Sequence, residues 1–506
     1  MNANLYALFS SKFPKDLSRC CIQTPDDRYY TWLDIERASA KIANLLTSLH
    51  LSAGARIAVQ VEKSPEALIL YLACLRAGFV FLPLNTAYQR TEIAYFIENA
   101  EPEVVVCAPS HFGWVSQIAF HAGTRHVFTL DAPLHGNNSG SLLDRATPMS
   151  DQFVTVTSQP EDLAAIVYTS GTTGRSKGAM LTHANLASNA LALHEAWAWQ
   201  SDDVLLHALP LFHVHGLFVA SHCALLNGSK MIFLPKFDVE QVIQHLPEAS
   251  IMMGVPTYYV RLLQDQRLNH LLCKNLRLVV SGSAPLLQET FKNFQERTGK
   301  TILERYGMSE TNILVSNPYE GERKAGTVGL PLPGVDVRIV NAQSQHCEND
   351  QIGDIQVKGP NVFCGYWRMP EKTAEEFTPD GFFRTGDVGK FDDDGYLTIV
   401  GRSKDLIITG GYNVYPKEIE SIIDAMPEVA ESAVIGLPHT DFGEAVCAVI
   451  VLNEQTQLEA NTVIAYLRAN IANFKVPKQV FFLKELPRNT MGKVQKNILR
   501  NLYQSD

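Results

Sequence analysis

The chain has 506 residues, of which 46% are hydrophobic and 19% charged, and its formal net charge at pH 7 is −10. This length exceeds what one hydrophobic core supports, so we expect two or three structural units of an ordinary globular protein. The acidic balance argues against nucleic-acid binding and against attachment to a membrane surface, because phosphate-rich partners require basic patches.

The sequence also lacks targeting and membrane signals. The N-terminal residues have neither the basic start and cleavage site of a signal peptide nor the arginine density of a transit peptide. The most apolar stretch, Ala67–Leu84, is interrupted by Arg76 and Gly78, so we expect no bilayer span. The cysteines are scattered, and the one close pair, Cys20 and Cys21, lacks metal-knuckle spacing, which fits a reducing compartment. We therefore expect a cytoplasmic enzyme.

Helix and strand signals alternate in the first hundred residues. The apolar spacing predicts a helix over Thr31–Leu49 and a strand over Arg56–Val61. Ser64, followed by proline and glutamate, is a helix start, and Gly78 ends that helix. A further buried strand follows at residues 103–107. This βαβ rhythm predicts a doubly wound, largely parallel sheet, and so an α/β fold.

A glycine- and hydroxyl-rich loop, Tyr168–Gly178, follows the strand predicted at Leu163–Val167 and precedes a helix predicted at Thr182–Leu193. Such a loop can turn its backbone N–H groups inward around a phosphate chain, while Lys177 supplies a positive charge. It is not a Walker A loop, because no Gly-Lys-Ser/Thr opens a helix here. Taken alone, the loop could equally be a surface turn.

The rest of the chain divides into three further parts. A second βα series has predicted strands at 204–208, 231–234, 251–255, 276–281 and 300–303. After Gly326 short strands with Gly/Pro turns predict a small β subdomain, and beyond Gly401 a unit of about 100 residues can fold alone. We therefore place a large N-terminal domain at residues 1–402 and a small α+β C-terminal domain at 403–506.

Six motifs accompany the loop in a fixed order. They are Leu209–Gly216 (LPLFHVHG), Ser281–Pro285 (SGSAP), Glu304–Glu310 (ERYGMSE), Arg384–Asp387 (RTGD), Gly401–Gly411 with Pro416–Ile419, and Pro487–Lys493 (PRNTMGK). Together with the loop they resemble the adenylate-forming superfamily, which includes acyl-CoA synthetases, luciferases and adenylation domains. The resemblance covers essentially the whole chain. It implies large doubly wound sheets, a β subdomain and a mobile C-terminal domain.

The resemblance also implies the chemistry. A carboxylate attacks the α-phosphorus of ATP and expels pyrophosphate, and a thiol then displaces AMP; ATP, Mg²⁺ and coenzyme A are the implied small-molecule partners. Cations and oriented N–H dipoles must offset the repulsion between the two anions. The implied ATP-binding residues are Thr169, Ser170, Gly171, Thr172, Thr173, Gly174, Lys177, Ser283, Ala284, Glu304, Arg305, Tyr306, Gly307, Met308, Ser309, Asp387, Arg402 and Lys493.

Individual roles follow from the matched positions. Thr169 and Glu310 are the implied neighbours of Mg²⁺, a hard ion suited to oxygen ligands. Lys493 occupies the Pro-x₄-Gly-Lys position and should bridge the substrate carboxylate and the α-phosphate. Lys404 matches the hinge about which the C-terminal domain rotates after adenylation. Gly411 should then reach the tunnel for the thiol.

The acid is predicted from three side chains. His213 matches the gating histidine near the acyl carboxylate, and His215 and Arg261 are polar where a fatty-acyl pocket would be apolar. An inward arginine would pair with a second carboxylate, and Ser283 completes the expected substrate set. The segments His213–Leu217, Arg305–Asn312 and 317–323 resemble malonyl-CoA synthetases, which also accept methylmalonate. We therefore expect malonate, ATP and CoA to give malonyl-CoA, AMP and pyrophosphate.

Plainer interpretations stay open at this stage. The carboxylates and basic residues could be surface groups, His213 and His215 could be core histidines, and Arg261 could be an exposed helix residue. The protein could also activate another short carboxylic acid or load a carrier protein. A nucleotide-binding regulator would be expected to have lost Lys493 or Glu310, and a kinase-type NTPase would need a Walker lysine. The sequence does not indicate an oligomeric state.

Overall fold

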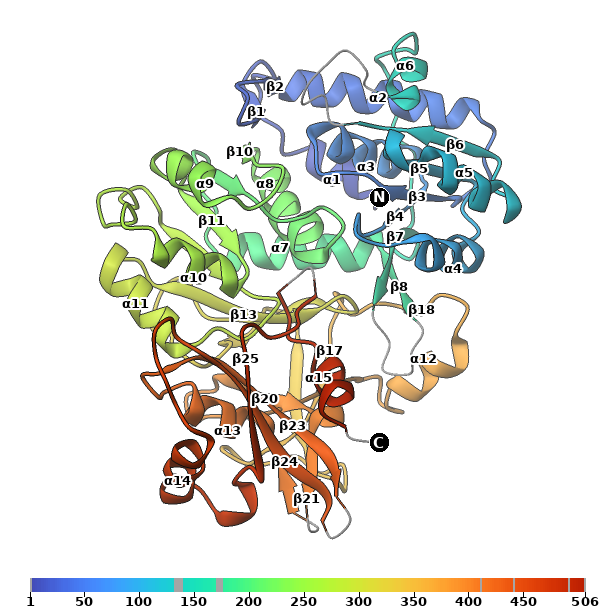
Figure 1. The fold of residues 1–506 in the computed structure, drawn as a ribbon. Coiled ribbons are helices and arrows are strands. Elements are labelled where there is room, and N and C mark those ends of the chain that lie inside the picture. The colour runs from blue at the N-terminus through green and yellow to red at the C-terminus, as the bar shows by residue number, and fades with distance from the viewer. Residues whose placement is uncertain are drawn as a thin grey trace.

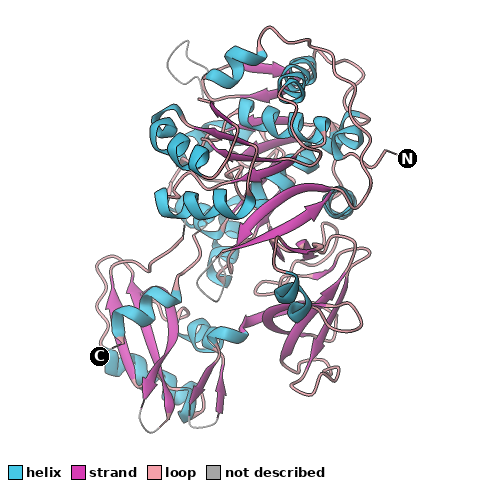
Figure 2. Ribbon diagram, turned by 90° about the vertical axis from the view of Figure 1, so that its right-hand side faces the viewer, coloured by secondary structure: helices cyan, strands magenta, loops and turns pink. Residues whose placement is uncertain are grey.

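A computed structural model describes residues 2–131, 140–169, 176–409, 412–439, 442–489 and 492–504. Two large sheets form the upper body, and a small β sheet and the C-terminal body lie below them (Figures 1 and 2). Within these ranges no helix combines the length and the apolar character needed to cross a bilayer. The division into a large domain at residues 1–402 and a small one at residues 403–506 stays a prediction.

The first sheet has the strand order β18-β8-β7-β4-β3-β5-β6. Its central strands pair in parallel, and β7, β8 and β18 pair antiparallel at one edge. The strands are β3 (Arg56–Gln60), β4 (Val80–Pro83), β5 (Val104–Cys107), β6 (His126–Thr129), β7 (Leu163–Thr169), β8 (Lys177–Thr182) and β18 (Gly365–Tyr366). The accompanying helices are α2 (Trp32–Ser48), α3 (Pro65–Ala77), α4 (Arg90–Ala100), α5 (Phe112–His121) and α6 (Ser141–Ala146).

The second sheet has the order β15-β14-β13-β12-β11-β9-β10-β1-β2, parallel in its centre and antiparallel at both edges. Its strands are β1 (Cys20–Gln23), β2 (Tyr29–Thr31), β9 (Val204–His207), β10 (Lys230–Phe233), β11 (Ile251–Gly254), β12 (Leu278–Ser281), β13 (Ile302–Met308), β14 (Asn312–Ser316) and β15 (Leu330–Pro331). Its helices are α1 (Leu5–Ser10), α7 (His183–Ala196), the π-helix η2 (His215–Ser221), α8 (His222–Asn227), α9 (Val239–His245), α10 (Pro256–Gln264) and α11 (Gln288–Thr298).

Helix α3 illustrates how local signals and burial combine. The Ser64 side chain accepts from the Ala67 N–H, Pro65 opens the first turn, and Gly78 closes the helix at φ +74°. Twelve of its residues, from the proline to Arg76, are buried, so it lies in the apolar core that joins the two sheets. A helix that is apolar all round belongs in the interior of a large protein.

The segment after the glycine-rich loop differs from its prediction. Strand β8 follows it directly and pairs antiparallel with β7, from Thr169 opposite Lys177 to Leu163 opposite Thr182. The expected helix does form, as α7, but only after this strand, with Thr182 as its N-cap. The loop therefore connects a β-hairpin, because the short apolar run after Lys177 pairs with its neighbour instead of entering the helix.

The β subdomain and the small body complete the chain. The subdomain sheet runs β16-β17-β19-β20, with β16 (Asp336–Val340), β17 (Gly353–Lys358), β19 (Phe383–Phe391) and β20 (Leu397–Arg402), and α12 (Pro370–Glu376) beside it. The small body has β21 (Ile407–Thr409), β22 (Tyr412–Val414), β23 (Val429–His439), β24 (Gly443–Leu452) and β25 (Gln479–Leu483), with α13 (Pro416–Ile423), α14 (Ala460–Asn470) and α15 (Lys496–Tyr503). Apolar clusters fill its two sheet faces separately from the main core.

Candidate active site

The small body meets the large one through the loop that carries Lys493. A Cβ added at Gly492 would lie 3.3 Å from Oγ1 of Thr257, at the start of α10. The Asn489 and Gly492 N–H groups donate to the carbonyl oxygens of Lys493 and Asn489, and the Asn489 side chain accepts the Lys493 N–H. The turn thus brings the lysine to the end of the second sheet where β11, β12 and β13 finish, which is where ligands bind in open α/β sheets.

Lys493 is half-buried among charged groups of both bodies. Burial lowers the pKa of its ammonium to about 8, and the nearby Arg402 lowers it further while Asp387 opposes the shift. Lys404, in the short helix η4 (Ser403–Asp405), is exposed and also acts on Lys493 through its charge. The lysine is therefore beside the expected nucleotide side chains in this conformation.

Asp387 is the centre of a paired cluster. In β19 it lies opposite Arg402 of β20, whose Nε is 3.0 Å from Asp387 Oδ1. The Tyr306 hydroxyl, from β13, donates to the other carboxylate oxygen at 2.5 Å. Asp387 is 4% exposed, so its charge is balanced inside the protein, and each oxygen keeps one lone pair for a further donor.

Glu310 and Thr169 lie together at the base of the hairpin. The Thr169 hydroxyl is 3.4 Å from Glu310 Oε1, and the Tyr366 hydroxyl donates to the same oxygen at 3.0 Å. Burial raises the pKa of the Glu310 carboxyl. Two protein oxygens on one side, with the remaining positions left to phosphate and water, suit the way Mg²⁺ is held beside nucleotides.

Lys177 begins β8 and is buried. Its Nζ lies 3.6 Å from Glu376 Oε1 and 4.2 Å from the centre of the Tyr366 ring. The ammonium is thereby held next to the Glu310 group. The loop residues Ser170, Gly171, Thr172, Thr173 and Gly174, and Gly411 of the small body, lie outside the described residues.

The residues expected to border the adenine lie within β13 and directly after β12 and β13. Glu304 is buried, accepts the Leu286 N–H at 3.0 Å and has a pKa raised to about 7 by burial. A Cβ at Gly307 would meet the Asn312 carbonyl oxygen at 1.9 Å, so only glycine allows the hairpin to β14. The partly exposed side chains here are Ser283, Ala284, Tyr306, Met308 and Ser309.

Two histidines, His213 and His215, lie where the acyl group of the substrate is expected to bind. The His215 side chain is 1% exposed, its Nδ1 is 3.3 Å from Ser283 Oγ, and its Nε2 has no partner within the described ranges. His213 Nδ1 accepts the His215 backbone N–H at 3.1 Å. Burial lowers the pKa of His213 to about 4 and that of His215 well below its usual value, with the charge of Arg305 adding to both shifts. Both imidazoles are therefore neutral near pH 7.

Backbone geometry holds this segment in place. Ser283 has φ +70°, a left-handed conformation that non-glycine residues seldom adopt outside functional sites. A Cβ at Gly216 would come within 2.0 Å of the Pro210 carbonyl oxygen, so η2 packs directly on the preceding turn. Sequence reasoning identified His215 and Ser283 but not the strain that turns the serine toward the histidine.

A buried lysine that the sequence did not single out supports the same segment. Lys63 Nζ is 2.9 Å from His207 Nδ1, 2.6 Å from the His207 carbonyl oxygen and 4.2 Å from the centre of the Phe233 ring. His207 Nε2 in turn reaches the Gly216 carbonyl oxygen at 3.0 Å. The one signal in the sequence was a lysine directly before the α3 N-cap, where it looks like an ordinary surface residue.

Arg261 does not point into the core: it is exposed on α10, whose buried positions are Tyr259 and Leu262. Its role at the substrate carboxylate stays a prediction. The helix therefore turns its apolar stripe to the sheet and leaves position 261 toward solvent. Its positive charge still acts on the nearby Tyr258 hydroxyl, which bonds the Ala208 carbonyl oxygen.

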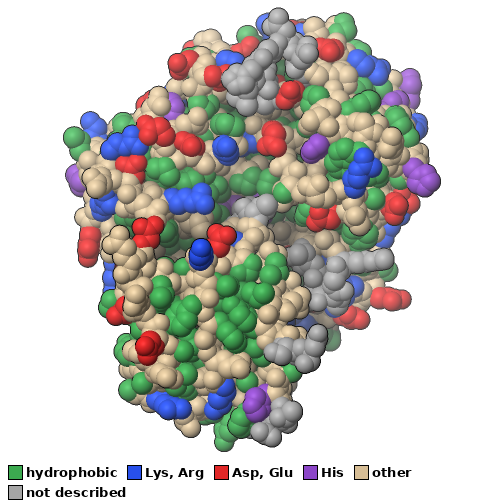
Figure 3. Space-filling model, viewed as in Figure 1, with side chains coloured by type: hydrophobic (Ala, Val, Ile, Leu, Met, Phe, Trp, Pro, Cys, Tyr) green, Lys and Arg blue, Asp and Glu red, His purple; other side chains and the backbone are tan. Residues whose placement is uncertain are grey.

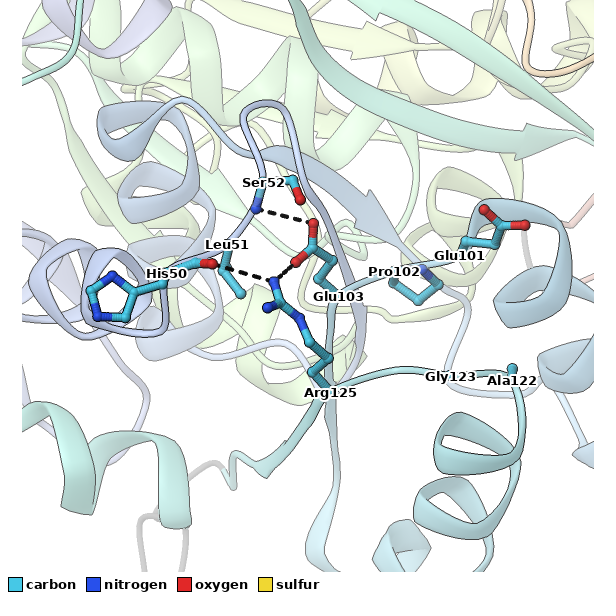
Figure 4. Close-up of a pocket in the computed structure, with 9 residues that line it drawn as sticks. All are labelled: His50, Leu51, Ser52, Glu101, Pro102, Glu103, Ala122, Gly123 and Arg125. Atoms are coloured by element: carbon cyan, nitrogen blue, oxygen red, sulfur yellow. Dashed lines mark hydrogen bonds and ion pairs between the residues drawn. The ribbon is translucent and has the colours of Figure 1, made fainter.

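Surface hollows lie away from these groups. One of about 340 Å³ is lined by residues of the first sheet, where Glu103 pairs with Arg125 and accepts the Ser52 N–H (Figure 4). Its charges already neutralise each other, so it offers no chemistry of its own. On the face shown in Figure 3, basic and acidic side chains are interspersed without a continuous basic stripe, as the net charge of −10 suggests.

Comparison with known proteins identifies the family. The AMP-binding enzyme model matches residues 11–367, and the AMP-binding enzyme C-terminal domain model matches residues 418–493. The chain belongs to the AMP-binding enzyme family. A malonate–CoA ligase of Arabidopsis thaliana is 37% identical over 480 residues, covering 88% of this chain and 78% of that protein.

Comparison with solved structures indicates which conformation this chain adopts. ATP-bound MatB from Rhodopseudomonas palustris is 52% identical to this AMP-binding enzyme, over 100% of this chain and 99% of that one, with a TM-score of 0.97. Apo MatB, with the same identity and coverage, gives 0.86. Since the two structures share one sequence, the difference in score reflects conformation. This chain thus adopts the arrangement of the ATP-bound relative, with Lys493 facing the nucleotide residues.

Proposed function

We propose that this AMP-binding enzyme ligates malonate to coenzyme A through an enzyme-bound malonyl adenylate, giving malonyl-CoA, AMP and pyrophosphate. The observation that carries the proposal is the acyl side of the site. His215 and Ser283 are hydrogen-bonding side chains at the end of β12 where a fatty acid would need apolar ones. Relatives that share this architecture ligate malonate, and methylmalonate is the next substrate to expect.

In the first step a malonate carboxylate oxygen attacks the α-phosphorus, a P–O bond forms, and the bond to the β-phosphate oxygen breaks to release pyrophosphate. Lys493 would hold the attacking carboxylate and the α-phosphate together and stabilise the negative charge of the transition state. Lys177 and the hairpin loop would bind the outer phosphates. Mg²⁺, held by Thr169 and Glu310 together with the phosphates, would neutralise charge on the leaving group.

The paired Asp387 cluster would bind the ribose. Arg402 and Tyr306 hold the carboxylate in place, so its free lone pairs can accept the sugar hydroxyls. Glu304, Arg305, Gly307, Met308, Ser309 and Ala284 would border the adenine and α-phosphate. His213, neutral at pH 7, would stand at the acyl carboxylate, and Arg261 would add positive charge at the rim of the pocket.

In the second step the CoA sulfur attacks the acyl carbon, a C–S bond forms, and the C–O bond to AMP breaks while the thiol proton leaves. We propose that residues 403–506 rotate about Lys404 relative to residues 1–402 between the steps. This motion would withdraw Lys493 and bring Gly411 to the thiol tunnel. Exposure of Lys404 between the two bodies supports this assignment. A cytoplasmic location stays a prediction.

A pyrophosphate-release screen tests the function. Purified protein, Mg²⁺-ATP and CoA are mixed with acetate, propionate, malonate, methylmalonate or succinate, and pyrophosphate, AMP and thioester are measured. We expect malonate to give the highest kcat/KM, with AMP and not ADP as the nucleotide product. Pyrophosphate released without any CoA thioester would favour carrier loading. A preference for a monocarboxylate would refute the malonate assignment.

A further inference from the structure

Lys63 and His207 form a buried pair between the two large sheets. Lys63 follows β3 of the first sheet and precedes the Ser64 cap of α3, whereas His207 is the last residue of β9 in the second sheet. The two residues are 7% and 1% exposed, and no carboxylate within the described ranges is in ion-pair contact with Lys63. Burial lowers the pKa of Lys63 well below its usual range, and its ammonium and amine forms both carry N–H groups to donate. The pair therefore depends on hydrogen bonds and not on an opposite charge.

The hydrogen bonds of His207 determine which ring nitrogen carries its proton. Nε2 is 3.0 Å from the Gly216 carbonyl oxygen and 3.1 Å from Ser221 Oγ. The Ser221 hydroxyl donates to the same carbonyl oxygen at 2.9 Å, so Nε2 faces two acceptors and must carry the proton. Burial holds the pKa of His207 well below its usual value, so the ring is neutral and Nδ1 is unprotonated. Lys63 Nζ, at 2.9 Å, is the donor to Nδ1.

The proton on Nε2 anchors one peptide group of the π-helix η2. The carbonyl oxygen of that peptide group belongs to Gly216 and accepts from His207. Its N–H belongs to Leu217 and donates to the His213 carbonyl oxygen at 3.0 Å. His207 thereby fixes the turn that leads from His213 into η2, whose first residue is His215. Turns of π-helix are rare in proteins and occur frequently at functional sites, which fits a segment held in place by a dedicated contact.

We propose that Lys63 is a positioning residue for adenylation: by donating to His207 Nδ1 it keeps the ring proton on Nε2, and so holds the turn that carries His213 and His215. The inference rests on the proposed function in that both histidines act beside the acid. Without the Lys63 donor a buried Nδ1 lone pair would be unpaired, and a ring that turned or exchanged its proton would lose the bond to Gly216. Lys63 acts on the substrate only through His207.

Two substitutions of His207 separate its two hydrogen bonds. In His207→Gln the amide nitrogen takes the place of Nε2 and can still donate to Gly216. In His207→Asn the shorter amide can accept from Lys63, but no N–H reaches Gly216. We expect His207→Asn to raise the KM for malonate and to lower kcat/KM for pyrophosphate release at least about tenfold, and His207→Gln to lose less than about threefold. The KM for ATP should stay within about twofold in both variants, because the turn borders the acid and not the nucleotide.

Lys63→Met removes the donor while keeping the length of the side chain. It should lower kcat/KM for malonate about tenfold with the KM for ATP unchanged, and Lys63→Met combined with His207→Asn should lose no more than the larger single loss, because both act through one contact. Nitrogen NMR of histidine-labelled protein should show His207 protonated at Nε2 alone in the wild type and as a mixture of tautomers in Lys63→Met. Lys292→Met, at an exposed lysine of α11, is the control.

The outcomes separate a positioning role from a merely structural one. All assays are run well below the unfolding midpoint of each variant, and the two His207 variants decide the matter if Lys63→Met does not fold. Equal losses in His207→Asn and His207→Gln, or an unchanged His207 tautomer in Lys63→Met, would overturn the proposal. Failure of the proposed function looks different: the wild type itself would then release no pyrophosphate with malonate.

Discussion

The nucleotide side and the acyl side of the proposed site differ in whether their charged side chains have partners within the protein. On the nucleotide side Asp387 has Arg402 and Tyr306 as partners, and Lys177 has Glu376. On the acyl side Arg305 has no described counter-ion. A ribose is neutral and needs groups already held in position, whereas a carboxylate brings a charge that the protein can leave unmatched. The comparison teaches that internal pairing and its absence both carry information about the ligand.

Removing Lys493 should have the largest effect. Lys493→Met removes the ammonium that is proposed to contact both the acid carboxylate and the α-phosphate. Adenylation should therefore slow by about 100- to 1,000-fold, the range for loss of one transition-state charge contact. Pyrophosphate release measures this step. Thioester formation from added malonyl adenylate should be nearly unchanged. Lys484→Met, at an exposed lysine of the same body, is the control. Equal loss in both half-reactions would contradict the assignment of Lys493 to the first step.

The pH dependence of adenylation should report the ionisation of Lys493. Lys493 has a pKa lowered to about 8 by burial, and its proposed role in adenylation requires the protonated form. The kcat/KM for adenylation should therefore be constant below pH 8 and fall about tenfold per pH unit above it, since this ratio reports the free enzyme. Lys493→Met should abolish that descending limb. A limb that persists in the variant would have to come from another group.

Asp387→Asn should weaken the nucleotide side alone. Loss of the ionised acceptor removes its ion pair with Arg402 and its bonds to the sugar, so the KM for ATP should rise about tenfold, or about 1.4 kcal/mol. The ratio of kcat/KM for malonate to kcat/KM for propionate should not change. Asp393→Asn, at an exposed acid of the same subdomain, is the control. A changed acid preference in Asp387→Asn would break the division into two sides.

The smallest predicted effect is on the free energy of unfolding. Replacing the buried cation Lys63 should lower it, whereas replacing the buried cation Arg305 should leave it unchanged or raise it. Lys63→Met leaves His207 Nδ1 without its Lys63 donor and leaves the His207 carbonyl oxygen with the Leu234 N–H alone, so the unfolding free energy should fall by about 1–3 kcal/mol. Arg305→Leu removes an unpaired charge and should leave the unliganded protein as stable or more stable. Denaturant midpoints at constant m-value measure both. Comparable destabilisation by Arg305→Leu would indicate that Arg305 is paired in the apo protein.

Much of the fold follows from local signals. The capping serine, proline and glycine of α3 placed that helix correctly, and most parallel strands of both sheets were expected from their apolar runs. The parallel strands β1, β4 and β6 were not predicted. The hairpin at β7 and β8 was not foreseen, because Gly178–Thr182 is too short for its pairing partner to be read from periodicity. Long-range pairing depends on which edge is free, and only the assembled sheet determines that.

By itself the sequence determined the family motifs and the ATP-dependent chemistry, and it supplied the residues that are proposed to carry that chemistry. Which arginine is buried on the acyl side was decided by tertiary structure. On α10 the apolar stripe leaves Arg261 in solvent, while both faces of β13 are covered, so Arg305 is buried whichever way it points. The spacing of apolar and polar residues predicts where a side chain points only when one face of its helix or strand is exposed to water. In the centre of this sheet both faces are covered, so spacing gives no such prediction.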